Sequence, residues 1–175
     1  MRKKLFSRKG LTLIEMLASI LIIALLAAGM STGMSAGLRV YSTSAFETSS
    51  ATLASNINTT LSDILRYSFD YKEYHWHNFP DFSISNEEYG MVNCYFKVVD
   101  GVLQVHYMPD MSGQTRSPKA VVNSGSYDNL EVKNFTITPR SDRKGDYFEI
   151  SYRIVSTVDP TATKDVKSIV RMINQ

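Results

Sequence analysis

Apolar residues fill the segment from Leu11 to Met30 almost without interruption. About 20 residues in a helix extend roughly 30 Å, which is enough to cross the hydrocarbon core of a membrane. The one charged residue within the segment is Glu15, and no other charge follows until Arg39. The pattern therefore predicts a membrane-spanning helix that carries a single carboxylate near its start.

Beyond this segment, apolar residues recur at helical spacing among serine, threonine and asparagine, and no proline occurs before Pro80. Such a stripe is typical of an amphipathic helix that buries one face. A continuous helix from Leu11 to about Tyr67 would be roughly 85 Å long, and only its second half could belong to a soluble domain. The residues of the stripe are Leu38, Tyr41, Ala45, Leu53, Ile57, Leu61, Ile64 and Leu65.

Three glycines, Gly29, Gly33 and Gly37, recur at every fourth position where the apolar segment gives way to the amphipathic one. Small residues at this spacing allow helices to approach closely, whereas each glycine costs a helix about 1 kcal/mol relative to alanine. One interpretation is close packing against other helices, with local bending or melting. The other is a kink beside the membrane that has no partner.

After Tyr67 the helical period ends, and an aromatic-rich stretch without clean periodicity leads to Gly90. We expect its aromatic rings to pack this connector onto the helix and the sheet. Its imidazoles and carboxylates lack a second cluster that would complete a zinc site, so no metal is predicted here. The candidate ligands considered are Asp70, Glu73, His75, His77 and Asp81, around Trp76.

The clearest local signal is Asp100-Gly101 between two β-rich runs, because this dipeptide favours a two-residue hairpin turn. The turn sets a register whose apolar members we expect to share one face. Lys97 would then lie opposite Gln104, and Tyr95 opposite His106, on the other face. Cys94 would point inward as a structural thiol. The apolar pairs are Val99–Val102, Val98–Leu103, Phe96–Val105 and Cys94–Tyr107.

Three more strands are predicted in the remainder, at 130–138, 147–155 and around 166–173. The first changes apolar phase near Lys133-Asn134, which indicates a bulge, and a loop is expected over 139–146.

Asp159 and Asp165 supply too few oxygen ligands to predict a calcium site. The fold class is α+β, a long helix on an antiparallel sheet of about four or five strands. The sequence contains no recognisable catalytic constellation or phosphate loop, so no enzyme and no cofactor are predicted.

Charge is distributed unevenly along the chain. The first ten residues contain five bases and no acid, whereas the rest carries 14 basic and 17 acidic residues, a net charge near −3. This arrangement favours a targeting signal over a nucleic-acid surface. By the positive-inside rule, the amino terminus faces the cytoplasm and the body lies outside it. With one cysteine, no intramolecular disulfide can form.

The stretch KGLTLIEMLASILIIALLAAG resembles the amino terminus of type IV pilins and pseudopilins. These proteins have a basic leader that ends in glycine, a hydrophobic helix directly after it, and glutamate as the fifth mature residue. Gly10 matches the residue before the cut, and Leu11, where phenylalanine is commoner, matches the new terminus. Thr12 and Glu15 match the polar pair. The resemblance implies removal of residues 1–10 by prepilin peptidase and N-methylation of Leu11.

The resemblance further implies a pilin fold and assembly into a filament, with residues 11–37 as the transmembrane and assembly helix. Residues 38–67 would form its amphipathic half, and 68–175 the globular domain. Glu15, with Thr12, would set subunit register, because the new amine of Leu11 on its own or a neighbouring chain can neutralise its charge. Alternatively, Glu15 merely lies among the cytoplasmic headgroups at little cost.

The partners expected from the resemblance are other pilin or pseudopilin subunits, prepilin peptidase, an assembly-platform membrane protein, and lipid before assembly. The chain would first be a single-pass cytoplasmic-membrane protein and then part of a cell-surface filament, as a minor subunit. Alternatives are a pseudopilin of type II secretion or competence, a tip adhesin, and a plain signal anchor. A signal peptide cleaved near Ala27-Ala28 or Ser35-Ala36 is a further alternative. Binding to DNA or a host surface has no support in the sequence.

Overall fold

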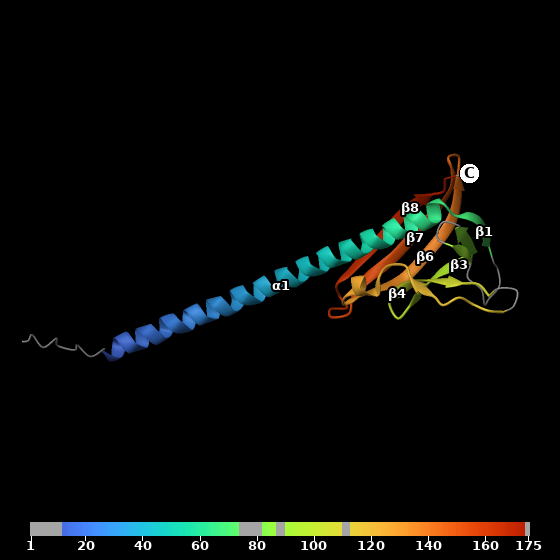
Figure 1. The fold of residues 1–175 in the computed structure, drawn as a ribbon. Helices are drawn as coiled ribbons and strands as arrows, with labels where there is room; N and C mark the ends of the chain where they lie inside the picture. Colours follow the sequence, from blue (N-terminus) through green and yellow to red (C-terminus); the bar gives the residue numbers. More distant parts are fainter. Residues whose placement is uncertain (1–11, 74–81, 87–89, 110–112, 174–175) are drawn as a thin grey trace, which may run out of the picture. The chain divides into compact units, whose positions relative to one another are not determined.

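The computed structural model describes residues 12–73, 82–86, 90–109 and 113–173. The chain divides into two compact units, residues 1–44 and 45–175, and the boundary falls inside the long helix α1, Leu13–Arg66. The first unit is described by α1 alone, and the second contains the rest of α1 and the strands (Figure 1). The single long helix predicted from the apolar pattern is confirmed within the described residues.

The strands of the second unit form two antiparallel sheets. One has the order β1-β2-β3-β4-β5 and the other the order β6-β7-β8. A short 3₁₀ helix, Ser124–Tyr127, connects them. The strands are β1 (Phe69–Glu73), β2 (Phe82–Asn86), β3 (Met91–Val99), β4 (Val102–Tyr107), β5 (Lys119–Ala120), β6 (Leu130–Asp142), β7 (Gly145–Ser156) and β8 (Thr163–Arg171).

The α+β class is therefore confirmed, but the expectation of one sheet with four or five strands was wrong. β1 and β2 lie in the stretch interpreted as an aromatic connector, where short strands with irregular register leave no clean alternation to recognise. The expected loop over 139–146 was also too long. β6 and β7 stay paired out to Asp142 and Gly145, so the turn between them is only two residues long.

The β3–β4 hairpin has the register that its turn predicted, from Val99–Val102 to Cys94–Tyr107. Asp100 and Gly101 both adopt positive φ, at 50° and 77°, as a type I′ turn requires. One detail of the expectation was wrong. Side chains alternate along a strand, so the Val99–Val102 pair lies on the face of Lys97 rather than on that of Cys94.

The predicted bulge in β6 is confirmed. Pairing with β7 shifts between Lys133 and Thr136, and Asn134 takes a positive φ of 52°. Before the bulge Leu130 and Val132 point inward, and after it Phe135 and Ile137 are the partly buried positions. The extra residue thus keeps apolar side chains on the inner face across an interruption of the alternation.

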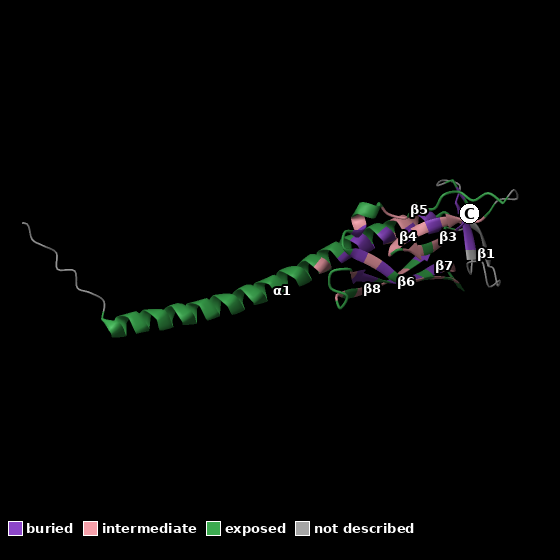
Figure 2. Ribbon diagram, turned by 90° about the horizontal axis from the view of Figure 1, so that it is seen from below, coloured by how far each residue is buried: buried purple, intermediate pink, exposed green. Residues whose placement is uncertain are grey.

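The core forms where the last turns of α1 pack against the inner faces of the strands (Figure 2). The later part of the apolar stripe predicted for the helix, from Leu53 to Leu65, supplies one side. The alternating residues of β7 supply much of the other, as their pattern predicted. The prediction of the helical stripe was wrong for Leu38, Tyr41 and Ala45, which are exposed because no strand covers that part of the helix. The fully or nearly buried side chains include Leu53, Ile57, Leu61, Ile64 and Leu65 from α1, and Phe148, Ile150, Tyr152 and Ile154 from β7.

Two asparagines fix α1 against both sheets. Asn58 accepts through its Oδ1 from the Tyr152 hydroxyl of β7, at 3.1 Å, and from the Ser168 hydroxyl of β8, at 3.2 Å. Asn86 of β2 donates to the Ile64 carbonyl at 2.7 Å. Buried polar groups are costly unless they are paired, so these contacts favour one register of helix on sheet.

The hairpin turn generates a prediction of stability. Replacement of Gly101 by alanine would place a Cβ 2.6 Å from Glu131 Cγ, in addition to straining a positive φ. We expect Gly101→Ala to lower the free energy of unfolding by about 1–3 kcal/mol, measured by urea denaturation of the full chain in detergent. Gly113→Ala is the matched control, since its φ is 78° but nothing lies within 4 Å. Equal losses in both variants would contradict a role for the Glu131 contact.

Candidate assembly site on the amino-terminal helix

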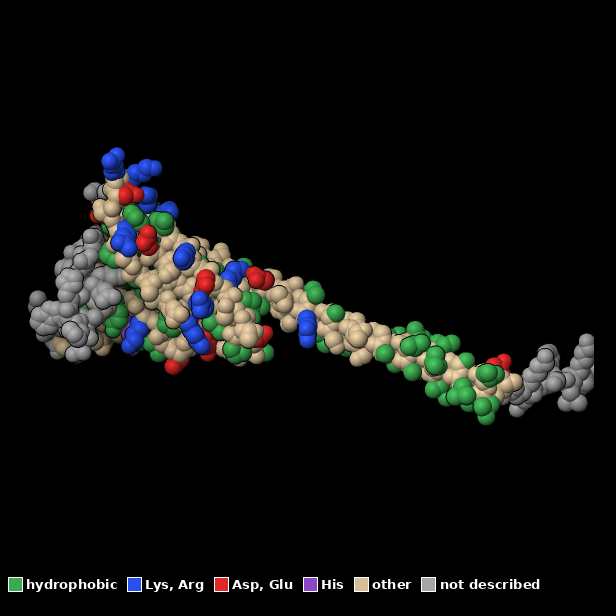
Figure 3. Space-filling view, turned by 180° about the vertical axis from the view of Figure 1, so that it is seen from behind, with side chains coloured by type: hydrophobic (Ala, Val, Ile, Leu, Met, Phe, Trp, Pro, Cys, Tyr) green, Lys and Arg blue, Asp and Glu red, His purple; other side chains and the backbone are tan. Residues whose placement is uncertain are grey.

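The helix of the first unit exposes apolar side chains on all of its sides. Every described residue from 12 to 44 is exposed, and on the face seen in Figure 3 hydrophobic side chains gather along the amino-terminal end of the helix. Within the described residues, α1 is the one helix long and apolar enough to span a membrane. The large exposed side chains are Leu13, Ile14, Met16, Leu17, Ile20, Leu21, Ile22, Ile23, Leu25, Leu26, Met30, Met34, Leu38, Val40 and Tyr41.

Such a surface cannot remain in water, because each large apolar side chain gains about 1.5–3 kcal/mol when it is buried. Isolated surface hydrophobic residues are ordinary, whereas a contiguous apolar surface marks a site of contact with protein or lipid. The first unit is therefore an interaction surface as a whole, and its polar residues are the exceptions that need an explanation.

Thr12 and Glu15 form a reciprocal cap at the start of this helix. The Thr12 amide and hydroxyl donate to Glu15 Oε2 at 2.8 and 2.9 Å. The Glu15 amide in turn approaches Thr12 Oγ1 at 3.4 Å. This is the capping-box arrangement, in which two otherwise unpaired donors of the first turn are satisfied by side chains. The carboxylate also lies at the end of the helix where the dipole favours negative charge.

The structure thus brings together two of the residues singled out in the sequence, Thr12 and Glu15. Gly10 and Leu11 lie outside the described residues, so cleavage, N-methylation and the partnership of Glu15 with a new amine stay predictions. The sequence comparison with pilins identified the polar pair but not its mutual hydrogen bonds. The spacing threonine-x-x-glutamate before an apolar run was the available signal for them.

Gly29, Gly33 and Gly37 lie within an uninterrupted α1, and apart from the helix's own adjacent backbone no atom of the described chain lies within 4 Å of the position where a Cβ would be. Nearby hydroxyls bond back to the helix, from Thr32 to the Gly29 carbonyl at 2.9 Å and from Ser35 to the Ser31 carbonyl at 2.9 Å. Local hydroxyl bonds of this kind keep polar groups satisfied without water. The stretch is therefore compatible with an apolar environment despite its polar residues.

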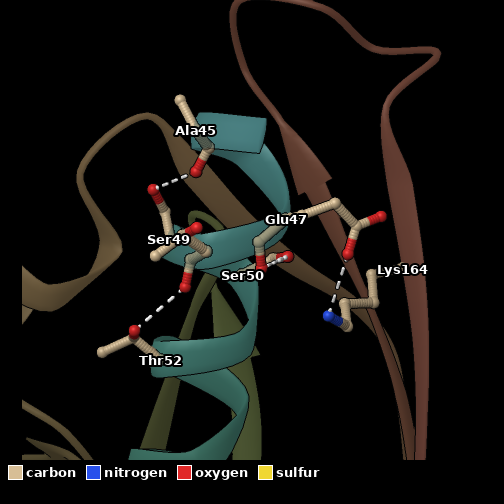
Figure 4. Close-up of polar contacts among 7 residues, drawn as sticks. Ala45, Glu47, Ser49, Ser50, Thr52 and Lys164 are labelled. Atoms are coloured by element: carbon tan, nitrogen blue, oxygen red, sulfur yellow. Dashed lines mark hydrogen bonds and ion pairs between the residues drawn. The ribbon is translucent and has the colours of Figure 1, made fainter. Parts of the chain in front are cut away.

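In the second unit, Glu47 of α1 pairs with Lys164 at the start of β8, with 3.2 Å between Oε2 and Nζ (Figure 4). The neighbouring hydroxyls turn back to the helix, with Ser49 donating to the Ala45 carbonyl and Thr52 to that of Thr48. No sequence pattern predicted the Glu47–Lys164 contact, because it joins residues 117 positions apart. Exposed pairs of this kind contribute at most about 1 kcal/mol.

Cys94, Asp159 and Asp165, the remaining candidates for a chemical role, each bond to neighbouring groups of the fold. Cys94 is buried, as expected, and donates through Sγ to the Ile84 carbonyl at 3.4 Å; burial raises the pKa of its thiol to about 11. Asp159 accepts from the Thr161 amide and hydroxyl, and Asp165 pairs with Arg153 at 2.6 Å. The described residues contain no group of three potential metal ligands. The histidines of the 68–90 stretch lie outside them.

Residues 5–31 match the family model described as the prokaryotic N-terminal methylation motif. The amino terminus is therefore of the prepilin type that type IV pilins and pseudopilins share, on an α+β chain whose long apolar helix is consistent with a pilin-like fold. The motif implies assembly with pilin-type subunits and a prepilin peptidase in general, and with the helix it fits a single-pass membrane anchor. Neither the curated proteins nor the solved structures gave a significant match.

The capping geometry generates a second prediction. Loss of an N-cap hydroxyl costs a helix about 0.5–2 kcal/mol. We therefore expect Thr12→Ala to speed amide hydrogen exchange in the first helical turn by roughly 2- to 30-fold, measured by NMR on the full chain in micelles. Thr12→Ser is the matched control and should retain slow exchange, since its hydroxyl can make the same bonds. Identical exchange in all three proteins would contradict the cap.

Proposed function

We propose that this chain is a structural, minor subunit of a type IV pilus-type filament. It inserts into the membrane through the first part of α1, is cleaved after Gly10 by prepilin peptidase, and enters the filament through the same helix. It has no catalytic role in this proposal. The prepilin-type motif over residues 5–31, continuing into the first part of α1, in which every described apolar side chain up to residue 44 is exposed, is the observation that supports it.

The two units of the chain differ in how their apolar side chains are covered, which supports a different role for each. In the second unit, one stripe of α1 is buried by the sheets, so this unit has a core of its own. In the first unit, the helix has no core and needs lipid or other helices around it. The proposal assigns the sheets to the filament surface and the exposed helix to its interior. Glu15 sets the register between subunits as they enter.

Mass spectrometry of the mature protein tests the processing. We expect a chain that begins at Leu11 and carries one methyl group on its amine, because removal of a basic leader exposes the helix start to assembly. The same spectra of purified filaments should find this subunit as a small fraction of the total. An intact Met1, or a terminus near Ala28 or Ala36, would contradict the prepilin interpretation.

Filament assembly tests the role of Glu15. We expect Glu15→Ala to insert into the membrane but to be strongly depleted from sheared filaments, because the carboxylate that sets register is gone. Immunoblots of membrane and filament fractions measure both pools. Glu47→Ala is the matched control, since it removes an exposed glutamate of the same helix whose Lys164 pair contributes little. Normal incorporation of Glu15→Ala would instead favour a headgroup position without a role in assembly.

A further inference from the structure

Arg39 is an isolated charge on the exposed helix of the first unit. It is the first charged residue after Glu15, and 23 uncharged residues separate the two. Within the described part of the chain, the Arg39 guanidinium has no hydrogen-bond or ion-pair partner, and the Ser42 hydroxyl at 2.9 Å donates to the backbone carbonyl of Arg39 rather than contacting its side chain. A guanidinium without a partner in its own chain needs a polar environment outside this chain.

The spacing of the two charges matches a bilayer. With a rise of 1.5 Å per residue, Arg39 lies about 36 Å along the helix from Glu15. An average tilt of about 20° reduces this distance to roughly 34 Å across the membrane. The hydrocarbon core is about 30 Å thick. When Glu15 lies at one edge of the core, Arg39 therefore lies just beyond the other edge, at the level of the headgroups.

The residues around Arg39 have the chemistry of a membrane interface. Tyr41 is 74% exposed and lies two positions further along, on the opposite side of the helix. Tyrosine is enriched at the headgroup level, and arginine reaches phosphate there while its aliphatic stem stays in the apolar layer. The next three residues, Ser42, Thr43 and Ser44, are polar, whereas Leu38 directly before Arg39 is apolar.

We propose that Arg39, with Tyr41, is the anchor that sets the depth of the helix by binding phospholipid headgroups at the outer surface of the membrane. This inference rests on the membrane-inserted stage of the proposed function. Arg39 binds lipid phosphate through its guanidinium, whose planar fork suits an anionic oxygen pair. The phosphates are those of the bilayer rather than of a free anion. The helix residues directly before Arg39 lie in the hydrocarbon core of the same bilayer, so its headgroups are the anions within reach.

The anchor also determines where the glycines lie. Measured along the helix from Glu15, the positions of Gly29, Gly33 and Gly37 are at about 21, 27 and 33 Å. They therefore occupy the outer half of the bilayer and end at the anchor. Glu15 lies at the inner boundary, where its cap with Thr12 already satisfies much of its polar character. Glu15 thus avoids the centre of the bilayer, where a charged side chain is most costly.

A cysteine scan tests the anchor. Single cysteines are introduced at positions 36–46 of the full chain, leaving out Arg39, Tyr41 and Thr43, and each protein is reconstituted in phosphatidylcholine vesicles with and without an anionic phospholipid. A membrane-impermeant maleimide then reports which positions are outside the bilayer. Native Cys94 is a silent background because it is buried and its pKa is raised to about 11. In the parent chain we expect labelling to begin within one turn of Arg39.

Moving the charge should move this boundary. Combining Arg39→Leu with Thr43→Arg displaces the guanidinium by one turn, so we expect labelling to begin about four residues, ~6 Å, further out. Arg39→Lys should keep the parent boundary. Arg66→Leu is the matched control, because it removes an arginine of the same helix in the second unit and should leave the boundary unchanged.

A boundary that stays in place when the charge moves would overturn the anchor, and so would an equal shift in Arg66→Leu. Resistance to alkaline carbonate extraction measures insertion separately. Extraction of the parent chain from vesicles would overturn the membrane-inserted stage, and with it the proposed function. If the parent chain resists extraction but the labelling boundary does not move with the charge, only the role of Arg39 is overturned.

Discussion

A helix that exposes apolar side chains on every side cannot be stable in water, and this constraint governs the whole chain. At roughly 25 cal/mol for each Å² of apolar surface, the exposed leucines, isoleucines and methionines of residues 13–38 are a large unfavourable term until something covers them. No intrachain contact in the described first unit relieves it. The environment of this helix, lipid or other helices, is therefore part of what makes the fold stable.

The same helix meets a different requirement in the second unit. There only one face of the helix packs against the sheets. A stripe that runs from Leu53 to Leu65 is buried while polar residues face outward. Hydrophobic burial has no direction, so by itself it would allow the apolar stripe of α1 to slide along the sheets. The bonds of Asn58 to Tyr152 and Ser168, and of Asn86 to the Ile64 carbonyl, are directional and favour one position. A single helix thus combines a non-specific apolar segment with a specifically docked one.

Local signals predicted local structure well and distant pairing poorly. The β3–β4 register followed from Asp100-Gly101, because a two-residue turn leaves no freedom in which residues face each other. The bulge at Asn134 followed from a phase change. β1 and β2 were missed, and so was the division into two sheets, since these depend on contacts between segments far apart. The Glu47–Lys164 pair was unpredictable for the same reason. At the candidate site, the resemblance located Thr12 and Glu15 but not their mutual cap.

That cap bears on how a carboxylate can set register at all. In the single chain, Glu15 Oε2 already accepts two hydrogen bonds from Thr12, so the acid is not an unsatisfied group that must find a partner at any cost. In the proposed function, the amine that cleavage creates at Leu11 would have to compete with these bonds or add to them through the remaining acceptor sites of the carboxylate. The difference in free energy between matched and mismatched neighbours is then smaller than the full cost of burying a charge. In the proposed function, Glu15 would therefore discriminate between alignments of subunits while the membrane-inserted chain stays stable before assembly.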